Sequence, residues 1–145
     1  MKAFNIFIIA LAMFVFSVSE MQTAYSQNCT PVLCSQFQYQ TVKIKMPAGG
    51  TERVSITFKN SGSGIWGIDD IGLVYTDAKA NPTNNNIWGV NRVSLQTAAV
   101  AGESATFEFS ITAPRTPGIY YFQWQMQSKG TSFGDPSTGI QVKVF

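Results

Sequence analysis

The feature that most constrains the fold of this chain is a period of two in its hydrophobic residues. Val54, Ile56 and Phe58 alternate with polar residues, and the 3.6-residue period of an amphipathic helix does not recur. Alternation or a short β-type run is found at 42–46, 54–58, 71–75, 92–95, 105–111, 120–126 and 140–144. Because alternation buries one face of a strand, the pattern predicts strands at these places.

Turn-forming residues separate the predicted strands. Pro, Gly, Asn and Ser gather at 47–50, 60–64, 81–86 and 117–118. Parallel strands would need long crossover connections, usually helical, and the sequence contains none. We therefore expect an all-β chain that folds as an immunoglobulin-like antiparallel β-sandwich of about seven strands.

Two aromatic residues support this fold. Tyr120 begins the penultimate strand, where such sandwiches place a buried ring whose hydroxyl bonds to the backbone a few residues upstream. Phe122 then stands where antibody domains carry a cysteine, so packing is expected to replace the disulfide between the sheets.

The first 26 residues have the composition of a secretory signal peptide. Lys2 precedes an apolar run at 6–16, and small residues stand three positions before and directly before a predicted cleavage after Ser26. The alternative is an uncleaved anchor, but that run is about half of the roughly 20 residues that a span needs. We expect domains at 1–26 (leader), 27–36 (N-terminal segment) and 37–145 (sandwich), no membrane span in the mature chain, and a secreted, extracellular or periplasmic location.

The only two cysteines, Cys29 and Cys34, lie close together in the N-terminal segment. In an exported chain they most simply form one disulfide around a short loop. An intermolecular bridge or a redox pair is the alternative, although the four-residue spacing lacks the Cys-x-x-Cys pattern of redox motifs.

Composition excludes several classes of function. The chain has no histidine, 12% charged residues and a net charge of +2. The basic surface that nucleic-acid binding requires is therefore missing, as are His-dependent triads. Asp69, Asp70 and Asp77 match no calcium loop, and no pair of acids stands out as catalytic. We expect no enzyme activity and no cofactor or metal.

Three tryptophans and a row of polar residues are the candidates for ligand contact. Trp124 is in phase with the apolar residues of its strand, which predicts a core position. Trp66 and Trp88 stand beside glycines at loop margins, where they either close the ends of the core or form a platform on which a sugar ring stacks. The outer face of the strand that contains Trp124 carries a polar row, which is either an ordinary solvated face or a surface that binds a partner or a glycan: Tyr121, Gln123, Gln125 and Gln127.

From Met46 onward the chain resembles a known family on an ordered set of short motifs. The residues that carry the resemblance include Asn60, Gly62, Pro114, Gly118, Tyr120, Trp124, Phe133 and Gly134. They resemble the four-tryptophan domain, the immunoglobulin-like module of the autophagy receptor called next-to-breast-cancer-one, and especially its bacterial secreted relatives. Ile56 and Thr138 replace two of the four tryptophans. The resemblance implies a non-catalytic docking or structural domain.

We therefore expect a secreted or periplasmic binding module whose first partner is an unknown protein. Polysaccharide binding through Trp66 and Trp88 is one alternative. A structural subunit that associates with itself through an edge strand or the cysteine pair is the other. Lys43 and Lys45 in the first predicted strand would guard its edge against such pairing.

Overall fold

The computed structural model describes residues 28–76 and 86–145. The predicted signal peptide and Asp77 lie outside the described residues, as does the polar loop at 81–86 except for Asn86. The described residues contain strands and no helix, which confirms the all-β prediction. No helix in these ranges could therefore cross a bilayer.

The described part of the chain contains ten strands. They are β1 (Ser35–Thr41), β2 (Lys45–Met46), β3 (Thr51–Asn60), β4 (Ile71–Tyr75), β5 (Arg92–Ser94), β6 (Ser104–Thr112), β7 (Gly118–Phe122), β8 (Trp124–Ser128), β9 (Thr131–Phe133) and β10 (Ile140–Val144).

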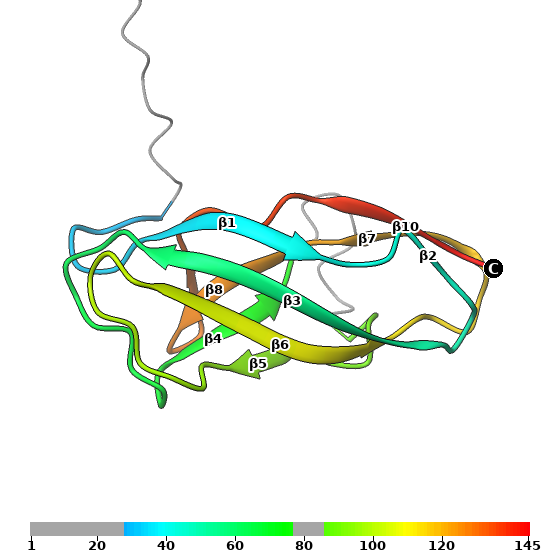
Figure 1. Ribbon diagram of the computed structural model, residues 1–145, viewed down its shortest axis with the longest axis horizontal. Helices are drawn as coiled ribbons and strands as arrows, with labels where there is room; N and C mark the ends of the chain where they lie inside the picture. Colours follow the sequence, from blue (N-terminus) through cyan, green and yellow to red (C-terminus); the bar gives the residue numbers. More distant parts are fainter. Residues whose placement is uncertain (1–27, 77–85) are drawn as a thin grey trace, which may run out of the picture.

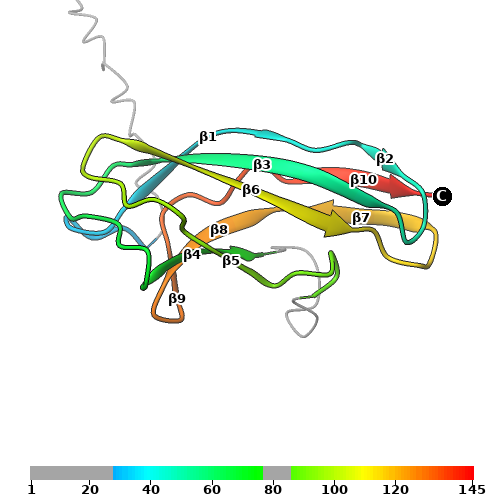
Figure 2. The same cartoon turned by 60° about the horizontal axis from the view of Figure 1, so that its bottom comes forward.

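The strands form two layers with the core between them (Figures 1 and 2). One layer is the sheet β1-β3-β6, and the other contains the sheets β5-β4-β8-β9 and β2-β10-β7. The two sheets of the second layer meet where β7 leads into β8, with one residue between them. All pairs are antiparallel except β2 with β10. The predicted immunoglobulin-like sandwich is confirmed.

The longest pairing shows how alternation builds the core. β3 and β6 pair without a register shift from Thr51 opposite Thr112 to Lys59 opposite Ser104. Their inward residues are apolar, and all but the partly buried Phe109 are buried: Val54, Ile56, Phe58, Ala105, Phe107, Phe109 and Ile111. Complete burial of one such side chain stabilises the fold by about 1.5–3 kcal/mol, so this pair of strands is a large part of the core.

The first predicted strand, at 42–46, is wrong in its bounds. Strand β1 ends at Thr41, β2 contains only Lys45 and Met46, and Ile44 is 63% exposed. Between the two strands the chain passes from one layer to the other, because β1 pairs with β3 and β2 pairs with β10. The alternation of apolar residues could not reveal this change of sheet.

The predicted strand at 120–126 is two strands. Phe122, Trp124 and Met126 are all buried, so the alternation was interpreted correctly. However, β7 pairs with β10 and β8 pairs with β4 and β9. Between the two strands, the backbone carbonyl of Gln123 accepts a hydrogen bond from the backbone amide of Thr76 (2.8 Å). Ser137 takes the place of a strand partner for Trp124, because its Oγ accepts a hydrogen bond from the backbone amide of Trp124 (3.0 Å).

The prediction for Phe122 and the hydroxyl bond predicted for Tyr120 are confirmed, but the Tyr120 ring is only partly buried, where a buried ring was predicted. The Tyr120 hydroxyl donates a hydrogen bond to the carbonyl of Thr116 (2.8 Å). Phe122 is fully buried, with its ring centroid 5.8 Å from that of Trp88 and 5.9 Å from that of Trp124. Aromatic packing thus occupies the position where antibody domains carry a disulfide.

We predict that Tyr120→Phe lowers the free energy of unfolding by about 1 kcal/mol, because only the bond to Thr116 is lost. Urea unfolding measures the change. Tyr39→Phe is the matched control, since Tyr39 is exposed and its hydroxyl has no hydrogen-bond partner in the described residues. Equal effects of the two substitutions would show that the Tyr120 bond contributes nothing.

Candidate functional site

All three tryptophans are buried. Trp66, Trp88 and Trp124 have no exposed surface. Trp66 packs edge-on against Phe133 with ring centroids 6.0 Å apart, and the indole of Trp88 donates a hydrogen bond to the carbonyl of Tyr121 (2.9 Å). The core position predicted for Trp124 is confirmed. A sugar-stacking platform of Trp66 and Trp88 is wrong for this structure, because neither indole presents a face to solvent.

We predict that Trp66→Ala and Trp88→Ala each lower the free energy of unfolding by about 3–5 kcal/mol, as expected for an aromatic side chain removed from a core. Chemical denaturation followed by circular dichroism measures the loss. Ile65→Ala is a neighbouring control, because Ile65 is exposed and its truncation should leave stability nearly unchanged. A loss below about 1 kcal/mol for both tryptophans would contradict their role in the core.

The predicted polar row is divided between two sheets. Tyr121 lies on β7, where its hydroxyl accepts a hydrogen bond from the side-chain amide of Gln141 (2.7 Å). The side-chain amides of Gln123 and Gln125 donate to the carbonyls of Ser137 (2.9 Å) and Gly134 (2.8 Å). These bonds hold the irregular segment that follows β9, so the two amides have a structural role.

Gln127 belongs to a polar outer face on the sheet β5-β4-β8-β9. The register places Gly72 of β4 between Ser94 and Gln127, and Val74 between Arg92 and Gln125. Ser132 of β9 lies next to Gln127. We use "polar outer face" for these residues: Gly72, Val74, Arg92, Ser94, Gln125, Gln127 and Ser132.

An open hollow of about 320 Å³ lies on this face. Its lining is mostly polar: Val74, Tyr75, Thr76, Asn91, Arg92, Gln127 and Ser132. Among the described residues that line the hollow, Arg92 is the one side chain that carries a charge.

Arg92 is the residue of this face that sequence reasoning missed as a functional candidate. A Cβ atom on Gly72 would lie 2.6 Å from the guanidinium carbon of Arg92, so the guanidinium group rests directly on the glycine. It donates hydrogen bonds to Ser94 Oγ (3.2 Å) and to the carbonyl of Asp70 (3.4 Å). No carboxylate of the described residues pairs with it. The signal in the sequence that could have pointed to this contact was Gly72 inside a predicted strand, because a glycine there often marks a place where another group approaches the backbone closely.

The acidic residues considered in the sequence, so far as they are described, do not form a site. Asp69 and Asp70 are exposed, and Asp70 lies 3.6 Å from the ammonium group of Lys129. Residues 28–76 and 86–145 contain no cluster of metal-ligating side chains.

Asn60 organises the end of the sandwich that lies opposite the carboxyl end of β10 (Figure 1). Its buried side-chain amide donates to the carbonyls of Gly64 (2.8 Å) and Ala99 (2.9 Å), and its Oδ1 accepts from the Gly62 amide (3.2 Å). One side chain therefore holds the 60–64 turn against the segment that precedes β6.

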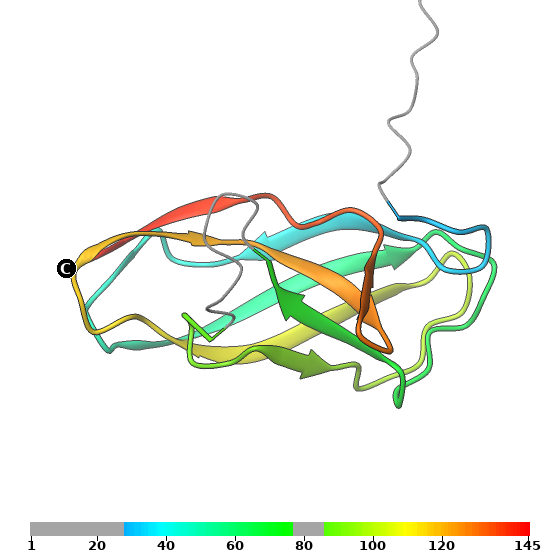
Figure 3. The ribbon, with the colours of Figure 1, turned by 180° about the vertical axis from the view of Figure 1, so that it is seen from behind.

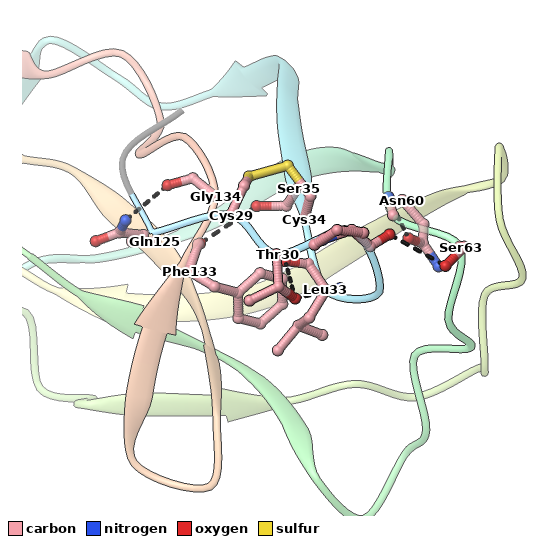
Figure 4. Close-up of a disulfide and its surroundings, with 12 residues drawn as sticks. Cys29, Thr30, Leu33, Cys34, Ser35, Asn60, Ser63, Gln125, Phe133 and Gly134 are labelled. Carbon is pink, nitrogen blue, oxygen red and sulfur yellow. Dashed lines mark hydrogen bonds between the residues drawn. A yellow bond between two sulfur atoms is a disulfide. The ribbon is translucent and has the colours of Figure 1, made fainter. Parts of the chain in front are cut away.

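The Cys29–Cys34 disulfide is present and confirms the predicted pairing (Figure 4). Its loop lies on the 60–64 turn. The carbonyls of Pro31, Val32 and Cys34 accept hydrogen bonds from the amides of Ser63 (2.9 Å), Gly64 (2.9 Å) and Ser61 (3.2 Å). A Cβ atom on Gly62 would lie 2.4 Å from the Val32 carbonyl oxygen, so only glycine fits there.

Comparison with known families agrees with this architecture. Residues 40–144 match the family described as the Ig-like domain from next to BRCA1 gene. The chain belongs to this family. No curated protein matches the sequence. The immunoglobulin-like part of the resemblance is thus confirmed, and its four-tryptophan and bacterial parts stay predictions.

The remaining motif residues of this Ig-like domain have structural positions. Gly134 has a φ of +71°, and a Cβ there would collide with Ser35, whose hydroxyl donates to the carbonyl of Phe133 (3.4 Å; Figure 4). The carbonyl of Pro114 accepts from the Gly49 amide (3.2 Å), and Gly118 lies against the ring of Tyr120. The motif thus reflects the fold of the Ig-like domain and leaves its ligand unspecified.

We predict that replacing both cysteines, Cys29→Ser with Cys34→Ser, lowers the free energy of unfolding of this Ig-like domain by at most about 3 kcal/mol, because the closed loop is short. The amides of Ser61, Ser63 and Gly64 should exchange hydrogen faster in the variant, since the carbonyls that protect them are no longer held. Exchange measured by NMR at these amides, with the β3 amides as an internal reference, tests this. Unchanged exchange would show that the loop stays in place without the disulfide.

Proposed function

We propose that this Ig-like domain is an exported, non-catalytic module that binds a protein partner through its polar outer face. The observation that carries the proposal is the guanidinium of Arg92, which lies exposed on Gly72 beside the hollow without a carboxylate partner among the described residues. A fork of donors held in this way suits a carboxylate, because Arg binds carboxylates in a bidentate geometry. The partner is therefore expected to present an Asp, a Glu or a C-terminal carboxylate.

The membership of the family supports the class of function. The Ig-like family suggests an interaction domain. Arg92, of a residue type enriched in protein interfaces, lies on this face among uncharged polar side chains that can hydrogen-bond to a partner. Lys and Glu, which protein interfaces use sparingly, are absent from it.

Action outside the cytoplasm rests on two further observations. The leader at 1–26 has the pattern of a signal peptide, and disulfides persist mainly in oxidising compartments. The disulfide of Cys29 and Cys34 agrees with such a location.

A polysaccharide is a weaker candidate for this face. The face includes no aromatic side chain, and Tyr75, which lines the hollow, is only 8% exposed. A sugar ring would therefore find no aromatic ring to stack on. Its hydroxyl groups could only hydrogen-bond to the amides and to Arg92.

The test uses capture from the extracellular or envelope fraction of the source organism, followed by a measured affinity for each captured protein. We expect Arg92→Ala to weaken the specific partner at least about ten-fold, equivalent to about 1.4 kcal/mol. Arg115→Ala is the matched control, because it removes the same charge from an exposed residue away from the face. It should bind like the native protein.

Gly72→Ala separates the position of the guanidinium from its charge. The added methyl group must displace Arg92, so binding should fall while the net charge and, because the side chain is flexible, the fold are kept. A partner that binds the native protein, Arg92→Ala and Gly72→Ala with equal affinity would overturn the proposed face. Saturable binding of a soluble polysaccharide that requires Arg92 would replace the protein partner by a glycan.

A further inference from the structure

One end of the sandwich combines unpaired cations with exposed apolar side chains. Strand β10 ends there beside two connections, because the Ala48 amide donates to the carbonyl of Phe145 (2.7 Å) and the Gly49 amide donates to that of Pro114 (3.2 Å). Figure 1 shows both connections around the carboxyl end of β10. We call this surface the cationic end and define it by six exposed residues: Ile44, Lys45, Arg115, Ile119, Lys143 and Phe145.

The pairing of the strands brings two lysines together. Lys45 of β2 is the register partner of Lys143 of β10, and Lys143 is in turn opposite Ile119 of β7. Met46 and Val144, the next residues along β2 and β10, are buried, so the two lysines point outward. Like charges on neighbouring strands repel each other, and an anion bound at the lysines relieves this repulsion.

The chain supplies no carboxylate side chain to these lysines at this end. The three described segments that meet there, at 43–50, 113–121 and 140–145, contain lysines and an arginine but no acidic residue. Glu52, which follows the first segment, pairs with Lys43 (2.6 Å). The ion pairs of the described residues include none of Lys45, Arg115 and Lys143. This end is therefore positively charged.

The opposite end of the sandwich, around Asn60, has a different balance of charge. The Asn60 amide donates to the carbonyl of Glu103 (2.7 Å), and the Asp135 amide donates to that of Ser35 (3.0 Å), the register partner of Asn60. These two carboxylates outnumber Lys59, the residue before Asn60. A charge distribution of this kind turns the cationic end toward an extended negative surface.

We propose that the cationic end binds the surface of a membrane that contains anionic lipids. Lys45, Arg115 and Lys143 contact the lipid phosphates. Ile119 and Phe145 enter the boundary between the headgroups and the acyl chains. Cations beside exposed apolar side chains are the combination that holds a protein at such a surface.

The apolar residues favour a membrane over an acidic polypeptide as the occupant. Ile44, Ile119 and Phe145 are 63%, 58% and 62% exposed. A bilayer surface covers apolar side chains and neutralises cations at once, whatever their spacing, whereas a polypeptide has to match each of them. The cationic end belongs to the sheet β2-β10-β7, and the polar outer face belongs to the sheet β5-β4-β8-β9. The proposal therefore stands apart from the proposed function.

The first experiment measures co-sedimentation of the purified protein, expressed from the full chain, with lipid vesicles. One set of vesicles contains equal parts of phosphatidylglycerol and phosphatidylcholine, and the other contains phosphatidylcholine alone. We expect saturable binding to the anionic vesicles that weakens as salt is added, and little binding to the neutral ones. Equal binding to both sets, or none to the anionic set, would overturn the proposal.

The second experiment locates the binding at the cationic end. Lys45→Gln with Lys143→Gln should weaken binding about thirty-fold, because each lysine near an anionic surface contributes a factor of about five. Lys59→Gln with Lys129→Gln removes the same charge elsewhere and should bind like the native protein. The leader is the same in both variants, and circular dichroism establishes that they are folded. Equal losses in the two double variants would contradict a role of the cationic end.

The third experiment tests the apolar side chains. Ile119→Ser keeps every charge and should weaken binding to anionic vesicles at least about five-fold. Ile65→Ser is the matched control, because Ile65 is 68% exposed and lies outside the cationic end. Native binding by Ile119→Ser, or tighter binding of polyglutamate than of anionic vesicles, would replace the membrane by an acidic polypeptide. Arg92→Ala should bind the vesicles normally, which separates this proposal from the proposed function.

Discussion

The packing of Trp124 joins the two layers, and the rest of the structure depends on it. Trp124 comes from β8, and its ring centroid lies 4.8 Å from that of Phe109 on the opposite sheet and 5.8 Å from that of Tyr75 on its own. Phe122 extends this contact to Trp88. Edge-on aromatic pairs contribute beyond the area they bury, about 0.5–1.5 kcal/mol each, so this series of rings can hold the layers together without a covalent link.

The disulfide has a different task at the end of the molecule. Seen from behind, the Cys29–Cys34 loop and the carboxyl end of β10 lie at opposite ends of the sandwich (Figure 3). The loop covers the turn organised by Asn60, and Gly62 gives it room to approach, while Gly134 gives room to Ser35, which directly follows the loop. A closed loop this short constrains few unfolded conformations, so its effect is local. The core therefore provides the stability of the domain, and the disulfide fixes the conformation of one end of the sandwich.

The burial of the aromatic residues in the core also determines which side chains are left for the surface. With all three tryptophans buried, the polar outer face contains serines, glutamines and Arg92, and binding there has to rely on hydrogen bonds and one charge. The opposite sheet ends in β6, where the backbone groups of Glu108 and Ser110 point away from β3 and have no backbone partner among the described residues.

The period-two pattern by itself determined the all-β class and the inward residues of β3, β6 and β8, because the direction of a side chain along a strand is a local property. The place of Tyr120 at the start of the penultimate strand then predicted its hydroxyl bond. The sequence also showed the cysteine pair, since residues so close in the chain can hardly avoid each other. It missed β1, although Phe37 and Tyr39 alternate with glutamines there, and it missed the change of sheet near Ile44. Only the tertiary structure decided that Trp66 and Trp88 are buried, that Gly72 supports Arg92, and that β6 lies at the edge of its sheet. Each of these depends on which strands become neighbours, and that choice is made by packing between residues far apart in the sequence.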